Sequence, residues 1–163
     1  ALEEMRMIVD SLDTAGDDLG MALGAFRSRM DPKLADAGLA TGWSFDSGIA
    51  SLHVPAAAVL DIYRLMQEAC ANVLRHAQAS RIDIRVTCND GGALIEIQDD
   101  GIGIPEEATS TGIGRSSMVA RAHRIGARVE WVASTPGTCV RLWLPPVRGR
   151  TSQDLPEAAQ LDR

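Results

Sequence analysis

The sequence predicts a two-layer α/β sandwich in which a mixed β-sheet, formed within residues 41–145, packs against three helices. Two pairs of alternating apolar segments, each joined by a short turn, indicate β-hairpins at residues 82–99 and 128–145. Three longer segments have apolar residues at helical spacing, at residues 19–30, 55–79 and 112–125. A chain of 163 residues is long enough for one domain with a core of its own.

The composition is that of a globular protein. Hydrophobic residues make up 45% of the chain and charged residues 23%, and the formal net charge is −6. This negative balance, without a concentrated basic stripe, argues against a nucleic-acid partner. No apolar run reaches the roughly 18 residues of a membrane span, and no signal peptide is visible. We expect a cytoplasmic domain, compatible with membrane anchoring of a full-length protein.

Three cysteines lie far apart in the sequence: Cys70, Cys88 and Cys139. Their number is odd, and no C-x-x-C pair is present. Each lies in an apolar segment. They are therefore expected to be small buried hydrophobes in a reducing compartment, with neither a disulfide nor a metal.

The first half of the chain alternates helices with short extended segments. Residues 2–12 have the spacing of a helix whose apolar stripe faces a partner, and an acidic pair before Leu19 favours the start of a second helix. The second helix is expected to end at Asp31 and Pro32, because a residue before proline is disfavoured in the α region. Residues 41–45 predict a strand, and residues 52–54 a further short one.

The helix at residues 55–79 carries polar side chains on one border of its apolar stripe. Glu68, Asn72, Arg75 and His76 fall together on this border at about 100° per residue. Such residues either line a groove or are solvated, and from this helix alone solvation is the favoured interpretation.

The hairpin at residues 82–99 ends in an acidic, glycine-rich stretch. Asp99 follows an alternating apolar strand, and Gly101 and Gly103 allow positive φ and close approach of the backbone. A carboxylate fixed there can accept a hydrogen bond from an exocyclic amine such as that of adenine. A plain turn is the alternative.

Another glycine pair, Gly112 and Gly114, precedes the third helix. Helix N-termini carry free amides and about half a positive charge, so this position suits a polyphosphate. The spacing matches neither a P-loop nor a dinucleotide motif. The helix is expected to end at Gly126 and to bury four side chains, those of Met118, Val119, Ala122 and Ile125. Residues 105–110, polar and small, suit a lid.

Phosphates also require a hard cation with oxygen ligands. Asn72 and Glu68, one helical turn apart, are candidate magnesium ligands, and Arg75 can neutralise phosphate charge.

Four ordered motifs resemble the nucleotide boxes of sensor histidine kinases, in the GHKL superfamily shared with gyrase, the 90-kilodalton heat-shock chaperone and the MutL proteins. They are E-x-x-x-N-x-x-R-H at residues 68–76, D-D-G-I-G-I at 99–104, G-I-G-R-S-S-M at 112–118 and P-G-T-C-V at 136–140. The resemblance covers residues 52–145 and is strongest to the nitrate-sensor and DesK-like subfamily. It implies the ATP-binding Bergerat fold, with the nucleotide lying between sheet and helices.

The resemblance also implies a role for each matched residue. Asp99 resembles the adenine-binding aspartate, and Asn72 resembles the magnesium-binding asparagine. Glu68 matches an acidic residue that polarises water in related ATPases and helps order the metal site in kinases. The remaining implied nucleotide-binding residues are Arg75, His76, Gly101, Gly103, Gly112, Gly114 and Thr138. Arg75 stands where lysine is usual.

Sensor kinases carry a phosphoaccepting histidine upstream on a dimerisation helix. This sequence has only His53, His76 and His123, none of them in that position. The chain is therefore expected to comprise the end of a dimerisation helix (residues 1–13), a catalytic and ATP-binding domain (14–146) and a flexible tail (147–163), and not to phosphorylate itself.

The implied function is transfer of the γ-phosphate of Mg-ATP to a histidine on a separate dimerisation domain, and from there to a response regulator. The fragment is expected to be monomeric and the full-length kinase a homodimer. One alternative is a serine/threonine kinase of the anti-sigma-factor type. Another is a non-catalytic, nucleotide-gated interaction module.

Overall fold

The computed structural model describes residues 18–52, 54–103 and 113–146. The predicted helix at residues 2–12, the predicted lid at 105–110, Gly112, His53 and the tail beyond residue 146 lie outside this part of the chain.

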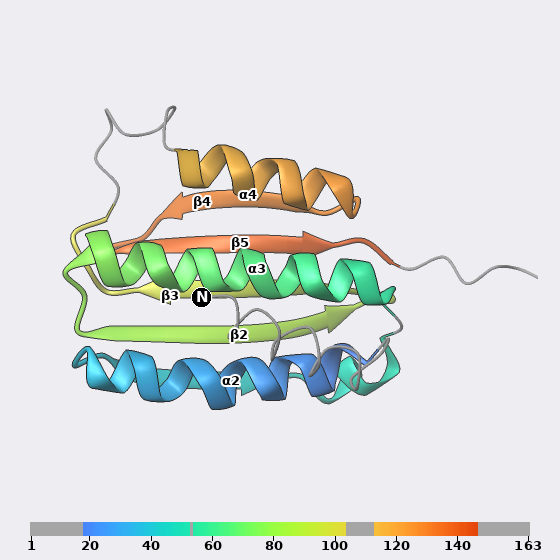
Figure 1. Cartoon of the computed structure of the whole chain (residues 1–163), viewed down its shortest axis with the longest axis horizontal. Helices are drawn as coiled ribbons and strands as arrows, with labels where there is room; N and C mark the ends of the chain where they lie inside the picture. The colour runs from blue at the N-terminus through green and yellow to red at the C-terminus, as the bar shows by residue number, and fades with distance from the viewer. Residues whose placement is uncertain (1–17, 53, 104–112, 147–163) are drawn as a thin grey trace, which may run out of the picture.

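Within these ranges a five-stranded sheet forms one layer and three α-helices the other (Figure 1). The described elements, in chain order, are α2 (Leu19–Asp36), β1 (Ala40–Phe45), the 3₁₀ turn η1 (Ser47–Ser51), α3 (Ala56–Asn72), the π turn η2 (Val73–Ala77), β2 (Arg81–Asn89), β3 (Gly92–Asp99), α4 (Ile113–Arg124), β4 (Arg128–Ala133) and β5 (Thr138–Leu144). The strand order is β1-β2-β3-β5-β4. Strand β1 runs parallel to β2 and the other neighbours are antiparallel, so the predicted mixed sheet is confirmed.

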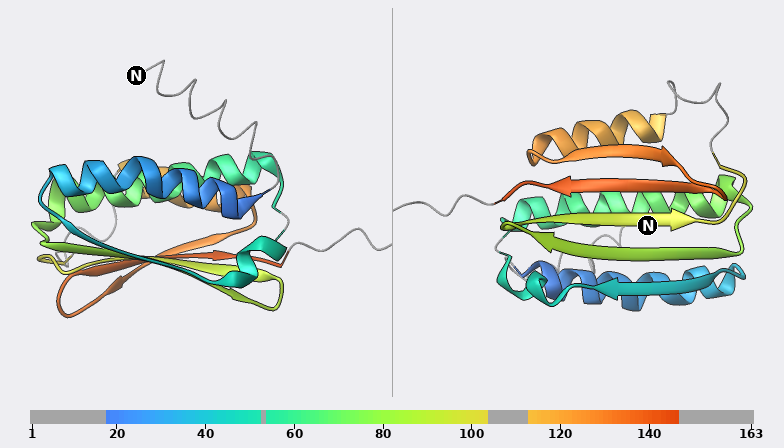
Figure 2. Two further views of the ribbon diagram at one scale, coloured as in Figure 1. Left: turned by 90° about the horizontal axis from the view of Figure 1, so that it is seen from below. Right: turned by 180° about the vertical axis from the view of Figure 1, so that it is seen from behind.

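The two faces of the sheet differ in chemistry because side chains alternate along each strand. On the inner face, Ile84, Ile97 and Val140 form one register row, and all three are buried beneath the helices. On the outer face the neighbouring row is charged: Glu96 lies between Arg85 and Arg141, at 3.8 and 3.0 Å. Figure 2 shows that α2, α3 and α4 all lie on the inner side. The core therefore lies between these two layers.

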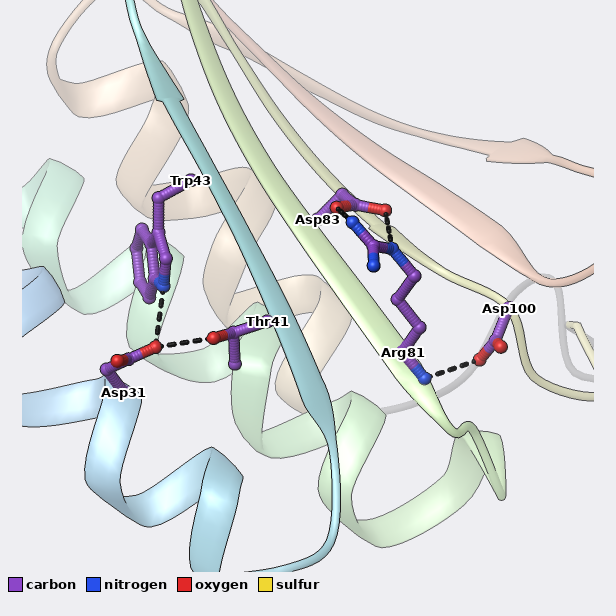
Figure 3. Close-up of polar contacts among 6 residues, drawn as sticks. All are labelled: Asp31, Thr41, Trp43, Arg81, Asp83 and Asp100. Atoms are coloured by element: carbon purple, nitrogen blue, oxygen red, sulfur yellow. Dashed lines mark hydrogen bonds and ion pairs between the residues drawn. The ribbon is translucent and has the colours of Figure 1, made fainter.

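Helix α2 does not end at Pro32, contrary to the sequence prediction. It continues to Asp36, and its buried stripe extends to Leu34, which has no exposed surface. The Asp31 carboxylate accepts hydrogen bonds from Thr41 Oγ1 (2.6 Å) and Trp43 Nε1 (2.8 Å), as Figure 3 shows. The burial of Leu34 and the hydrogen bonds from β1 to Asp31 stabilise the last turns of the helix. Together they outweigh the tendency of the residue before proline to leave the α region.

Two further predictions need correction. Residues 47–51 form a 3₁₀ turn capped by Asp46, and neither Leu52 nor Val54 lies in a strand. The α-helix that begins at Ala56 ends at Asn72 and is followed by the π turn, so regular helix does not extend to residue 79.

Helix α4 follows its prediction at its C-terminal end. Met118 and Ala122 are 1% exposed, whereas Val119 is 49% exposed and does not face the core. The helix is closed by Gly126 at φ +70°, with the Ala127 amide donating to the Ala122 carbonyl at 2.9 Å. This is the Schellman arrangement, in which a residue with positive φ satisfies the last carbonyls.

The cysteines have the predicted burial at two of three positions. Cys70 and Cys139 are buried, Cys88 is half-buried, and all three are free thiols. Burial raises the pKa of the Cys70 thiol to about 12. Cys70 therefore acts as a small hydrophobe in the core.

Candidate functional site

Four segments that are distant in the sequence meet at one end of the sheet. Figure 1 shows the π turn after α3, the end of β3, the start of α4 and the β4–β5 turn at the same edge. All of the described residues that the sequence singled out for nucleotide or metal binding lie on these segments or on the last turns of α3.

Asp99 is the last residue of β3, and two backbone amides hold its carboxylate. It is 5% exposed. Its Oδ1 accepts hydrogen bonds from the amides of Gly101 (2.9 Å) and Thr138 (3.3 Å). Among the described residues, the hydrogen bonds to the Asp99 side chain both end on Oδ1. The backbone thereby fixes the orientation of a buried acceptor.

The glycines around Asp99 are required because other backbone passes close to them. A Cβ on Gly101 would overlap the carbonyl of Ala77 at the end of the π turn. The same carbonyl accepts a hydrogen bond from the Ile102 amide at 2.8 Å. Gly137, in the β4–β5 turn, has φ +87°, and a Cβ there would overlap the backbone carbonyl of Asp99. These contacts join the π turn, the end of β3 and the β4–β5 turn into one unit.

Asp100 has a structural role that the sequence prediction did not assign. Its carboxylate accepts from the Ser80 amide (2.8 Å), the Ser80 hydroxyl (2.6 Å) and the Arg81 amide (2.8 Å), and Figure 3 shows its contact with Arg81. The Ser80 hydroxyl and then these amides hold the pKa of Asp100 below its usual value. Asp100 thus fixes the start of β2 beside the Asp99 turn. In the sequence, the only sign of this role is that the motif has two consecutive aspartates, Asp99 and Asp100.

The π turn was also missed from sequence. Residues Val73–Ala77 are wound more widely than an α-helix and end at Gln78, which has φ +50°. Turns of this kind are short insertions in α-helices and are frequent at functional sites. Arg75 and His76 lie on it and are both exposed.

Glu68 links α3 to the start of α4. Its Oε1 lies 3.7 Å from Arg75 Nη1, and it would be 2.7 Å from a Cβ placed on Gly114. Asn72 lies one turn beyond Glu68 and is half-buried. Glu68, Arg75 and the first turn of α4 therefore form one polar cluster.

The structure groups the predicted residues into two clusters on the same edge. The first cluster contains Asp99, Gly101, Gly103 and Thr138. A Cβ added to Gly103 would lie 3.4 Å from the Gly137 carbonyl oxygen. The second contains Glu68, Arg75 and Gly114. The π turn that follows Asn72 joins them, because its last residue, Ala77, contacts Gly101 and Ile102.

A mixed sheet beneath three helices, with a buried acid and glycine turns at one edge, defines a two-layer α/β domain with a polar site at one end of its sheet. Residues 57–148, more than half of the chain, match the family of histidine kinase-, DNA gyrase B- and HSP90-like ATPases. The chain belongs to this family.

Its relatives in sequence are sensor kinases and sensor proteins. It is 32% identical over 113 residues to the nitrate/nitrite sensor protein NarQ of Escherichia coli, covering 68% of this chain and 20% of NarQ. It is 31% identical over 84 residues to the signal transduction histidine-protein kinase/phosphatase UhpB of Salmonella typhimurium, covering 52% of this chain and 17% of UhpB. The chain therefore spans a fifth or less of the length of these two relatives.

Solved structures agree on the fold. The histidine kinase domain of the blue-light activated histidine kinase EL346 from Erythrobacter litoralis matches with a TM-score of 0.72 and 23% identity, over 88% of this chain and 71% of that one. The resemblance to the sensor histidine kinases and the predicted two-layer α/β fold are both confirmed. Among the described residues, no helix has the length and apolar character needed to cross a bilayer.

Proposed function

We propose that this chain is the ATP-binding catalytic domain of a two-component sensor histidine kinase, and that residues 14–146 form it. The observation that carries the proposal is the rigid, buried carboxylate of Asp99 between two glycine turns, at the edge where α4 begins. A fixed carboxylate acceptor suits the exocyclic amine of adenine. Gly101, Gly103 and Thr138 would form the remainder of the base site.

The second cluster suits the phosphates. The first amides of α4, including that of Gly114, would face the negative charge, and Arg75 and His76 on the exposed π turn would add hydrogen-bond donors. Gly112, which the sequence places in the same phosphate site, lies outside the described residues. Catalysis would consist of positioning and charge neutralisation, since phosphoryl transfer asks little covalent chemistry of the protein.

The donor set fits Mg²⁺. The described residues contain no cluster of three His, Cys, Asp or Glu side chains that could enclose an ion. Glu68 and Asn72 offer one carboxylate and one amide oxygen a turn apart. Magnesium is usually held in this way, by one or two protein oxygens together with phosphate oxygens and water. When bound, it would neutralise phosphate charge, and Glu68 would either support the metal site or act as a base.

We expect Asn72→Ala to abolish most of the gain in ATP affinity that magnesium provides. The loss should be roughly tenfold or more, as for other groups that support a metal site. Calorimetric titration of ATP with and without magnesium measures it, and adenosine affinity should be unchanged. Equal ATP affinities with and without magnesium in the parent protein would contradict the assignment.

The partners follow from the proposed reaction. The chain would phosphorylate a histidine on the dimerisation domain of the same kinase, which would pass the phosphate to a response regulator. The full-length kinase would be a homodimer, whereas this chain alone would be monomeric.

Mixing the chain with a dimerisation domain that carries its histidine, in the presence of labelled Mg-ATP, tests the function. We expect acid-labile label on the dimerisation domain, because phosphohistidine is hydrolysed in acid and phosphoserine is not. ATP binding without any transfer would instead indicate the non-catalytic module. Acid-stable label would indicate the serine/threonine kinase.

A further inference from the structure

Helix α4 is tied to α3 by a carboxylate that is almost buried. Asp61, on α3, is 7% exposed. It accepts hydrogen bonds from Arg124 Nε at Oδ2 (2.9 Å) and from Arg124 Nη2 at Oδ1 (2.6 Å), and Arg121 Nη1 lies 3.7 Å from Oδ1. Both arginines belong to the last turns of α4. We call these three residues the Asp61 cluster.

Few of the described side chains of α4 are apolar and buried. Among its described side chains only Met118 and Ala122 are fully buried, and they are one helical turn apart. Apolar packing is not directional, so two such side chains oppose removal of the helix from the core more than they oppose sliding along its axis. A bidentate arginine–carboxylate pair, in contrast, has a defined geometry.

The Asp61 cluster and the candidate phosphate site lie at matched positions along the two helices. The helices run in opposite directions, with the end of α3 beside the start of α4 (Figure 1). From Asp61 to Glu68 is seven residues on α3, and from Gly114 to Arg121 is also seven on α4. At 1.5 Å per residue both intervals are about 10 Å. Arg121, 3.7 Å from Asp61, therefore lies at the axial position that brings Gly114 against Glu68. Arg124 lies one turn further along α4, and its long side chain extends to the same carboxylate.

We propose that the Asp61 cluster is a positioning device that sets the axial register of α4 along α3, and so places the first turn of α4 against Glu68. The proposal rests on the proposed function, in which that first turn receives the phosphates of ATP. Without the cluster, α4 shifts along α3 and its first amides move away from the metal-binding side chains. The adenine site around Asp99, which lies on β3 and β5, stays as it is.

The test compares ATP with adenosine, which lacks the phosphates. Arg124→Gln changes a side chain that is 59% exposed and removes the bidentate contact. We expect it to weaken binding of Mg-ATP roughly tenfold, within the range of coupling between groups linked by a backbone shift. Adenosine affinity, followed by NMR titration, should not change. Asp61→Asn should act in the same direction, and Arg124→Lys should recover part of the loss, since lysine keeps the charge but not the two-pronged geometry.

Arg141→Gln is the matched control. Arg141 Nε donates to Glu96 Oε1 at 3.0 Å on the outer face of the sheet, away from the helices. This variant loses a single arginine–carboxylate hydrogen bond that does not involve α3 or α4, and it should bind both ligands as the parent does.

The outcomes separate the register proposal from the function on which it rests. Parent protein that binds neither ligand would contradict the ATP-binding function itself. Parent protein that binds ATP, together with an Arg124→Gln variant of unchanged ATP affinity, would overturn the register proposal alone. Equal losses for ATP and adenosine would also overturn it, because they would indicate general loosening of the fold. If Asp61→Asn does not fold, the Arg124 variants decide the question.

Discussion

Asp99→Asn should weaken ATP binding by an order of magnitude or more. The Oδ1 atom of Asp99 is held by the amides of Gly101 and Thr138, so an asparagine would keep its oxygen there and turn its amino group toward the ligand. A donor would then face the donor amine of adenine, where a charged acceptor stood. Loss of one charge-assisted hydrogen bond corresponds to about 1.5–3 kcal/mol. Calorimetry with Mg-ATP measures the change.

A matched acid lies at the far end of the same hairpin. Asp90 is exposed in the β2–β3 turn and has φ +48°, a conformation that asparagine also adopts readily. Asp90→Asn removes the same charge and should leave both ATP affinity and melting temperature unchanged. If Asp99→Asn bound ATP as tightly as the parent, Asp99 would not be the residue that recognises the base.

Gly137→Ala should be among the most destabilising single substitutions in the domain. Gly137 has φ +87°, and the added Cβ would overlap the backbone carbonyl of Asp99 and lie 2.7 Å from Asp99 Oδ1. Strain at positive φ and overpacking each cost about 1–3 kcal/mol, so a total of about 3 kcal/mol or more is expected. Since Asp99 must move to relieve the contact, ATP affinity should fall as well. Urea unfolding and calorimetry report the two effects.

Gly38→Ala separates strain from crowding. Gly38 has φ +83°, close to that of Gly137, but no atom lies within 4 Å of the position its Cβ would take. This variant should lose about 1 kcal/mol through the backbone conformation alone and keep its ATP affinity. Equal losses for the two variants would mean that the contact with Asp99 is unimportant.

The two hairpins and the third helix were predictable because their signals are local. Alternation of apolar and polar residues on both sides of a glycine or proline turn indicates a β-hairpin from local sequence alone. The β2–β3 and β4–β5 hairpins both show this pattern. Asp99 at the mouth of β3 follows from the same alternation. The resemblance to the family rests on four spaced motifs and depends on no contact between distant residues.

Other features depend on partners that are distant in the sequence. Continuation of α2 through Pro32 depends on the burial of Leu34 and on bonds from β1 to Asp31. Asp100 and Asp61 are ordinary acids in the sequence, and their roles arise only when Ser80 and Arg124 are brought beside them.

Periodicity and turn chemistry act over a few residues, so the class of fold and the hairpins could be read from the sequence, as could the choice of residues that we propose for ATP. Tertiary structure alone decided the position of β5 between β3 and β4, the π turn after α3 and the register of α4 on α3. Those features minimise the free energy of the whole packed domain, to which contacts between distant segments contribute as much as local preferences do.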